Sequence, residues 1–234
     1  MKTFKSAFVA FTLAEVLITL GIIGIVAAIT IPTISKNIRH SELQQQFKKS
    51  YAVMSQAIAY TKMDLGTDNI KQTYTYHEGS TYVNAPEFIN AFYNRLKIEG
   101  DKTYKVPRVN RYTVSPRNYT NTANAYWDYI GHENPSELLP DGSSVDCMIN
   151  SGRINLSVDL NGPYKKPNRV GYDIFYFVIH SDNRLRPPKL GDLNTFYICD
   201  KTSTSEQNGM SCSYWAMIDK NPNDPTKGYW ESLD

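Results

Sequence analysis

The chain has 234 residues, and its 41% hydrophobic and 21% charged residues are typical of a folded protein, which excludes general disorder. The net charge is +2, and Lys2 and Lys5 account for both units, so the rest of the chain sums to zero. This balance gives no indication of a nucleic-acid partner, and we expect none.

An uncharged apolar segment, Val16–Ser35, follows the amino terminus directly. Its 20 residues are enough to cross ~30 Å of hydrocarbon at a rise of 1.5 Å per residue. Glu15 stands at its start, and an ionised carboxylate at bilayer depth costs roughly 2.5 to 3.5 kcal/mol. A secretory signal peptide, with Val26–Ala28 as its cleavage region, and an uncleaved signal anchor both favour an unbroken apolar segment. Glu15 therefore fits neither of these two commoner interpretations.

A short motif, Phe11-Thr12-Leu13-Ala14-Glu15, follows a basic leader and precedes an apolar helix that contains Pro32. This arrangement resembles the class III signal of type IV pilins and of the pseudopilins of type II secretion systems. The resemblance implies that a membrane aspartyl peptidase cuts between Ala10 and Phe11 and then methylates the amine of Phe11. The family usually has Gly where this chain has Ala10, and we expect this small residue to be tolerated with slower processing. Pro32 falls where the family commonly has a helix-bending proline.

Two interpretations of Glu15 remain open. In a filament, its carboxylate would neutralise the amine of Phe11 on a neighbouring subunit, and removing one partner of such a buried pair costs ~3 to 5 kcal/mol. Alternatively, Glu15 lies at the membrane interface near a helix amino terminus, where the macrodipole favours it by ~0.3 to 1 kcal/mol. Both can hold, one before assembly and one after it.

The helical pattern continues beyond Pro32, because Leu43, Phe47, Tyr51, Met54 and Ile58 follow one another at helical spacing. Gly66 is a natural helix stop. The sequence therefore predicts a leader at residues 1–10, a transmembrane or filament-core helix at 11–35, its amphipathic continuation at 36–65 and a globular head at 66–234.

The fold class that we predict is α+β, with the long amino-terminal helix packed on an antiparallel β-sheet head, as in pilins. A shorter helix is expected over 85–98, with Asn84 as its cap, and the stretch 101–140 is expected to be irregular. Runs of apolar and β-branched residues bounded by turn residues predict strands; these cover 143–150, 154–160, 173–180, 195–199 and 213–219.

The three cysteines, Cys147, Cys199 and Cys212, are too few for a disulfide scaffold and lack metal-ligand spacing. One bridge with one thiol left over is the simplest count. Cys199 and Cys212 flank the polar loop "DKTSTSEQNGMS", and closing a loop of this size would contribute ~3 kcal/mol. The family resemblance agrees, because many type IV pilins close a carboxy-terminal loop in this way. A bridge from Cys147 to either of the others remains open.

A second, shorter resemblance covers residues 158–177, which are similar to a strand-loop-strand element of many prepilin-like proteins. Some pseudopilins bind calcium in a carboxy-terminal loop, and Asp159, Asn161 and Asp173 carry hard oxygen ligands that suit calcium. Their spacing does not match the EF-hand loop. Side chains that cap turns around glycine explain the same residues, and we expect no other cofactor.

No hydrolase, zinc-protease or phosphate-binding motif occurs, so we do not expect an enzyme. The resemblance implies a structural subunit of a type IV pilus or of a type II secretion pseudopilus. Its partners would be copies of itself and other pilins, the prepilin peptidase and the assembly platform of the inner membrane. The precursor would cross the inner membrane once, with its head outside the cytoplasm, and then enter a periplasmic or extracellular filament.

Two other functions remain open. The first is a minor pilin that binds a surface or DNA through Arg184, Arg186 and Lys189. The second is a membrane-anchored domain of the cell envelope that never polymerises. The second function predicts an intact leader and no effect of changing Glu15.

Overall fold

The structure of the chain is a computed structural model that describes residues 12–78, 81–82, 85–96, 116–125, 137–150, 152–188 and 198–233. It divides into two compact units, Met1–Ser41 and Glu42–Asp234. Each unit is described by itself below. The predicted helix cap Asn84 and the predicted cleavage residues Ala10 and Phe11 lie outside the described residues.

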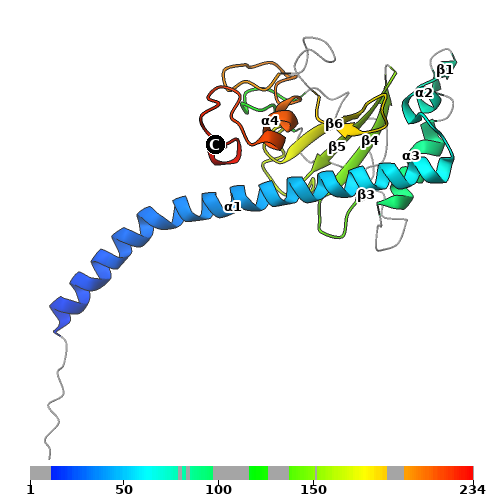
Figure 1. The fold of residues 1–234 in the computed structure, drawn as a ribbon. Helices are drawn as coiled ribbons and strands as arrows, with labels where there is room; N and C mark the ends of the chain where they lie inside the picture. The colour runs from blue at the N-terminus through cyan, green and yellow to red at the C-terminus, as the bar shows by residue number, and fades with distance from the viewer. Residues whose placement is uncertain are drawn as a thin grey trace, which may run out of the picture. The chain divides into compact units, whose positions relative to one another are not determined.

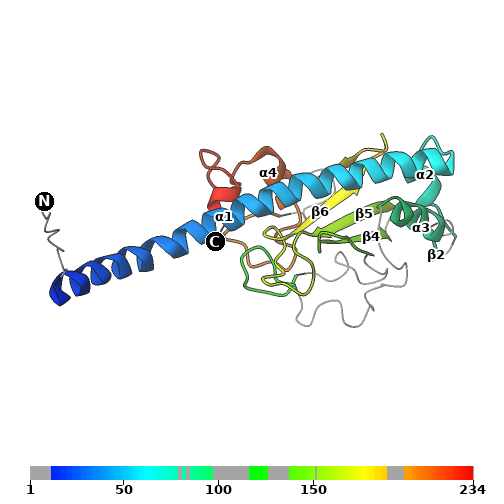
Figure 2. The same cartoon turned by 90° about the horizontal axis from the view of Figure 1, so that it is seen from below.

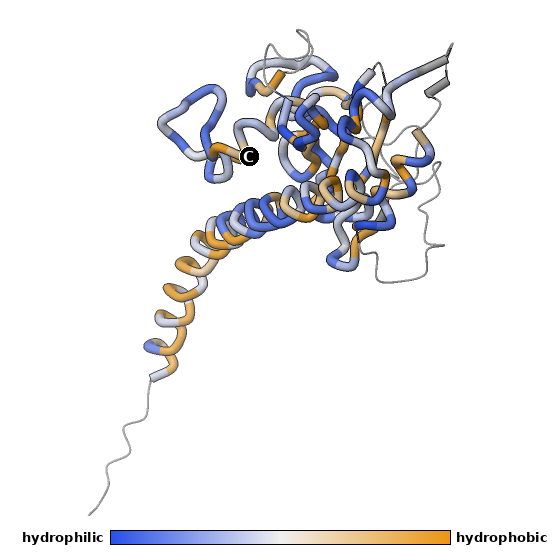
Figure 3. The backbone as a smooth tube through the Cα atoms, turned by 45° about the vertical axis from the view of Figure 1, so that its right-hand side comes forward, coloured by the Kyte–Doolittle hydropathy of each residue, from blue (hydrophilic) through white to orange (hydrophobic). Residues whose placement is uncertain are grey.

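The first element is helix α1, Leu13–Leu65, which confirms the predicted long amino-terminal helix (Figure 1). Its amino-terminal part is predominantly hydrophobic (Figure 3) and exposes large apolar side chains such as Leu17, Ile18 and Leu20. Pro32 removes one backbone hydrogen bond, yet the helix continues through it without a break. A local melting of the helix at Pro32 is therefore not observed, and the bend there stays a prediction.

The second unit is built on an antiparallel sheet in which the described strands follow one another in chain order. Adjacent strands pair directly, with Cys147 opposite Leu156 and Leu156 opposite Phe177. This arrangement confirms the predicted antiparallel sheet and three of its strands. The strands are β3 Glu137–Leu138, β4 Ser144–Asn150, β5 Arg153–Asp159, β6 Ile174–Ile179 and β7 Leu185–Arg186.

One face of this sheet packs on residues 42–65 of α1 (Figure 1 and Figure 2). Phe47 is fully buried there, and its ring centroid lies 4.7 Å from that of Phe175, 5.7 Å from that of Phe177 and 5.4 Å from that of Trp230. The hydroxyl of Tyr51 donates to the carbonyl of Leu185 at 2.9 Å. The apolar stripe predicted from helical spacing is thus the side of α1 that meets the sheet.

Two short helices and a hairpin follow α1: α2 Ile70–Tyr74, β1 His77–Glu78, β2 Thr81–Tyr82 and α3 Ala85–Arg95. Helix α3 confirms the helix predicted over 85–98 as far as Arg95, and residues 97–98 lie outside the described residues. It buries Phe88 and Phe92, whose rings stack with centroids 6.1 Å apart. The hydroxyl of Tyr93 accepts the backbone N–H of Cys147 at 3.0 Å, which joins α3 to β4.

The strand predicted at 213–219 is wrong, because Cys212–Ile218 forms helix α4. Cys212, Ser213 and Ala216 are its buried residues, a spacing that suits one side of a helix. Of the strand predicted at 195–199, the described part forms a single bridge between Ile198 and Asn208. The last element is the 3-10 helix Trp230–Ser232, which was not predicted.

Candidate functional site

The side chains of Thr12 and Glu15 cap the amino terminus of α1 through reciprocal hydrogen bonds. Oε2 of Glu15 accepts the backbone N–H and the hydroxyl of Thr12, each at 2.8 Å. The hydroxyl oxygen of Thr12 accepts the backbone N–H of Glu15 at 3.2 Å. This arrangement is a capping box, which satisfies donors that the first helical turn leaves without partners. Its sequence signal is Thr-x-x-Glu before an apolar run, and the chain carries this signal from Thr12 to Glu15.

The second oxygen of Glu15, Oε1, accepts no hydrogen bond among the described residues, and the side chain is exposed. One carboxylate group can therefore cap its own helix through Oε2 and offer Oε1 to a cation. A primary amine is a suitable partner, since an ammonium group carries charge and three donors.

Beyond Glu15, the polar side chains of α1 within two turns of Gly21 and Gly24 find their hydrogen-bond acceptors inside the helix. The hydroxyls of Thr19 and Thr30 donate to the carbonyls of Val16 and Val26, both at 2.9 Å. Gly21 and Gly24 leave open space, because a Cβ added to either would meet no atom within 4 Å. The segment can thus enter hydrocarbon or allow another helix to approach closely.

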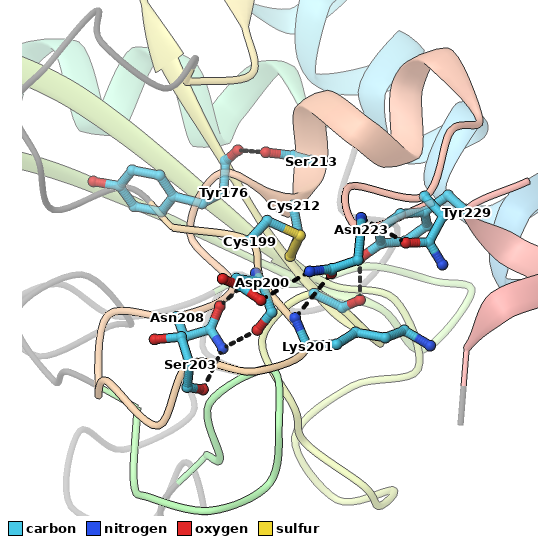
Figure 4. Close-up of a disulfide and its surroundings, with 12 residues drawn as sticks. Tyr176, Cys199, Asp200, Lys201, Ser203, Asn208, Cys212, Ser213, Asn223 and Tyr229 are labelled. Atoms are coloured by element: carbon cyan, nitrogen blue, oxygen red, sulfur yellow. Dashed lines mark hydrogen bonds between the residues drawn. A yellow bond between two sulfur atoms is a disulfide. The ribbon is translucent and has the colours of Figure 1, made fainter. Parts of the chain in front are cut away.

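The two cysteines predicted to pair, Cys199 and Cys212, form a disulfide with an S–S distance of 1.98 Å and a Cα–Cα distance of 4.9 Å (Figure 4). Cys147 is not part of a disulfide and is fully buried in β4, so the alternative bridges are not formed. Burial raises the pKa of the Cys147 thiol well above its ordinary value. A thiol in this environment is unreactive.

The disulfide lies against a tight turn of the chain at Gly171. A Cβ added to Gly171 would lie 2.8 Å from Sγ of Cys212, and its φ of +80° also favours glycine. The hydroxyl of Tyr229 donates to the carbonyl of Gly171, and the hydroxyl of Ser213 donates to the carbonyl of Tyr176. The closed loop and α4 are therefore fixed to β6 and to the end of the chain.

Polar side chains hold the loop between the cysteines together (Figure 4). Nδ2 of Asn208 donates to the carbonyls of Asp200 and Ser203 at 2.7 and 2.8 Å. Asn223 receives the backbone N–H of Lys201 at 2.9 Å and donates to the carboxylate of Asp200 at the same distance. These bonds link the loop to the segment after α4, so the disulfide closes a structure that is already well hydrogen-bonded.

Removing the disulfide by a paired Cys199→Ser and Cys212→Ser substitution should lower the free energy of unfolding of the intact chain by ~3 kcal/mol, because the unfolded chain gains loop entropy. Thermal unfolding in detergent micelles would measure the loss. A reducing agent should destabilise the parent to a similar extent and leave the double variant unchanged. Equal sensitivity of both proteins to the reductant would contradict a stabilising role for this bond.

The three residues proposed as calcium ligands are used for turns. Oδ1 of Asp159 accepts the backbone N–H groups of Asn161 and Gly162 at 3.3 and 2.9 Å. Asp173 accepts the backbone N–H groups of Asn168 and Arg169 at 3.0 and 2.6 Å, and Nδ2 of Asn161 at 3.2 Å. Thus Asn161 and Asp173 meet, whereas Asp159 caps its own turn.

These contacts support the turn interpretation over a calcium site. No group of three or more His, Cys, Asp or Glu residues able to hold a metal occurs in the part of the chain that the structure describes. Calcium stays a prediction, and a loss of thermal stability on adding a chelator would support it.

Asp173 should make stability depend on pH. Burial raises its pKa from 3.8 to about 6, although the N–H groups of Arg169 and Asn168 partly oppose this rise. The folded chain therefore binds this proton more tightly than the unfolded chain does. The stability that Asp173 contributes is full below pH ~4 and is lost as the pH rises through ~6. Thermal unfolding as a function of pH would measure this dependence.

The matched variants for this measurement are Asp173→Asn and, as a control, Asp68→Asn at an exposed position. Asp173→Asn should lower stability at every pH, since its amide NH₂ must face backbone donors, but it should flatten the profile between pH ~4 and ~6. Asp68→Asn should keep the parent profile. An unchanged slope in Asp173→Asn would assign the dependence to other groups.

Together, fold and site define an α+β protein whose amino-terminal helix is long and apolar enough to span a membrane and whose carboxy-terminal loop is closed by a disulfide. No protein-family model matches the chain, and no curated protein and no solved structure is significantly similar to it.

Proposed function

We propose that this chain is the precursor of a structural subunit of a type IV pilus or of a type II secretion pseudopilus. A prepilin peptidase removes residues 1–10 and methylates Phe11. The apolar part of α1 holds the subunit in the inner membrane, with its head outside the cytoplasm, until it joins a filament with copies of itself and other pilins.

The observation that carries this proposal is the lone carboxylate at the start of an otherwise uncharged apolar helix. Glu15 stands four residues after Phe11, one of its oxygens caps the helix, and the other accepts no hydrogen bond among the described residues. In the filament this oxygen accepts a hydrogen bond from the amine of Phe11 of a neighbouring subunit. The pair would fix the axial register of one subunit on the next, because either charge alone is costly in an apolar core.

A minor subunit that binds a surface or DNA has less support. Arg186 already pairs with the carboxylate of Asp182, and Lys189 lies outside the described residues. Arg184, two residues before Arg186, is exposed. One paired and one exposed arginine are a weak basis for recognising an acidic polymer, which needs several phosphate contacts.

The proposal is tested by intact-mass and amino-terminal analysis of the protein from membranes of cells with and without the prepilin peptidase. We expect a mature chain that begins at N-methylated Phe11, and we expect it to disappear without the peptidase. A chain that begins at Met1 in both cell types would favour an anchored domain, and one that begins after Ala28 would favour a secreted protein.

A further inference from the structure

The second unit contains a cavity of about 440 Å³ that neither the proposed assembly contact nor the disulfide uses. It is bounded by one side of α1 between Lys49 and Tyr60, by the last residues of α3 and by the turn at 139–141. Its volume falls within the range of cavities that hold small organic ligands.

The buried part of the cavity lining is apolar. Ala57, Leu96 and Leu139 are all less than a tenth exposed and come from the three different sides. This surface suits the C–H groups of a ligand and offers no hydrogen bond of its own.

Both cations of the lining are already paired with carboxylates. Nζ of Lys49 lies 2.7 Å from Oδ2 of Asp141, and the guanidinium of Arg95 makes two hydrogen bonds to Asp64. Burial opposes ionisation of Asp141, but hydrogen bonds from Lys49 and Ser143 outweigh it, so the pKa of Asp141 is lowered and the pair stays charged. A phosphate or another anion would have to break one of these pairs, so the charge balance favours a neutral ligand.

Besides the paired Lys49 and Arg95, the exposed part of the lining includes amide and aromatic side chains. The side chains of Gln56 and Asn94 are exposed and offer donors and acceptors. The ring of Tyr60 is 45% exposed, and the guanidinium carbon of Arg95 lies 5.8 Å from its centroid. The carboxylate of Asp64 already neutralises the Arg95 guanidinium that lies over this ring.

We propose that this cavity binds a neutral saccharide, in the size range of a mono- or disaccharide unit. A sugar ring has an apolar C–H face that suits the buried surface of Ala57, Leu96 and Leu139 and the ring of Tyr60. Its hydroxyls both donate and accept, which matches the amides of Gln56 and Asn94. This binding goes beyond a role in a filament and does not depend on it.

The test is saturation-transfer NMR on the intact chain, held in detergent micelles whose headgroup is not a sugar. Cellobiose, maltose and N,N′-diacetylchitobiose serve as probes, and inorganic phosphate and a neutral tripeptide serve as competitors. We expect transfer to at least one disaccharide, with sub-millimolar to millimolar affinity, and no competition by phosphate. No transfer to any of the three, or displacement by phosphate or by the tripeptide, would overturn the proposal.

The variants keep the assignment to this cavity testable. Gln56→Ala combined with Asn94→Ala changes only exposed side chains, so folding should be preserved, and we expect affinity to fall at least tenfold. Gln72→Ala, an exposed glutamine on α2 outside the lining, is the matched control and should bind as the parent does. Equal binding by the double variant and the control would place the saccharide elsewhere and refute the site.

Discussion

Replacing Glu15 by Gln should stop filament assembly while the subunit still enters the membrane. If the carboxylate neutralises the amine of a neighbouring Phe11, the substitution leaves that ammonium group unpaired in an apolar surrounding, at ~3 to 5 kcal/mol. This corresponds to a fall of about a hundredfold or more in incorporation of the subunit. The measurement is the ratio of subunit in sheared filaments to subunit in membranes.

The capping box makes this experiment sharper, because Gln can replace Glu as the third helical residue of such a box. Glu15→Gln therefore removes the charge and keeps the cap, whereas Thr12→Ala removes the hydroxyl of the cap and keeps the charge. We expect Thr12→Ala to assemble, with a loss of ~0.5 to 2 kcal/mol in helix stability. The exposed Glu42, farther along the same helix, provides a matched control as Glu42→Gln.

The opposite pattern would contradict the charge-pair hypothesis. If Glu15→Gln assembles as well as the parent and Thr12→Ala does not, the carboxylate acts on its own helix and not on a neighbour. Normal assembly of both variants would mean that neither Glu15 nor Thr12 contributes to the assembly contact.

The elements that sequence predicted well are those with a strong period. Phe47, Met54 and Ile58 recur at helical spacing and are fully or almost fully buried on one side of α1. Strand β5 alternates buried apolar residues with polar ones, and Leu156 and Val158 lie on the face that α1 covers. Such periods are read from the sequence because each element presents one side to a common core.

Helix α4 was missed because it has seven residues, too few for a helical period to differ from an alternating one. Two contacts far apart in sequence fix it: the disulfide to Cys199, and the bond from Ser213 to the carbonyl of Tyr176. Trp230 adds a third, since its indole N–H donates to the carbonyl of Ala216 at 3.1 Å. Tertiary contacts of this kind decide the state of a short segment and leave no local signal.

Within the candidate sites, sequence named residue types but not their partners. Asp159, Asn161 and Asp173 were named for their side-chain oxygens, yet which backbone N–H each carboxylate accepts depends on the path of the loop. The cavity beside α3 gave no signal at all, because its lining comes from three segments with unrelated patterns. Such a site exists only after α1, α3 and the turn at 139–141 have packed together.

The packing of α1 on the sheet gives the second large prediction, for Phe47→Ala. Phe47 is fully buried, and its ring meets those of Phe175, Phe177 and Trp230. Truncation removes apolar contacts and leaves a cavity between helix and sheet, so the free energy of unfolding should fall by ~3 to 5 kcal/mol. Denaturant unfolding of the intact chain in detergent, followed by tryptophan fluorescence, would measure the loss, since Trp230 lies in the same cluster.

Phe47→Leu serves as the matched variant, because it keeps most of the apolar volume and should cost less than Phe47→Ala. Met63→Ala, at an exposed position of the same helix, should cost little. A cost for Phe47→Ala as small as that for Met63→Ala would mean that this ring does not hold the helix on the sheet. The expected order, with Ala worse than Leu and Leu worse than the exposed control, follows only if residues 42–65 of α1 are an integral layer of the head, as the shared aromatic cluster requires.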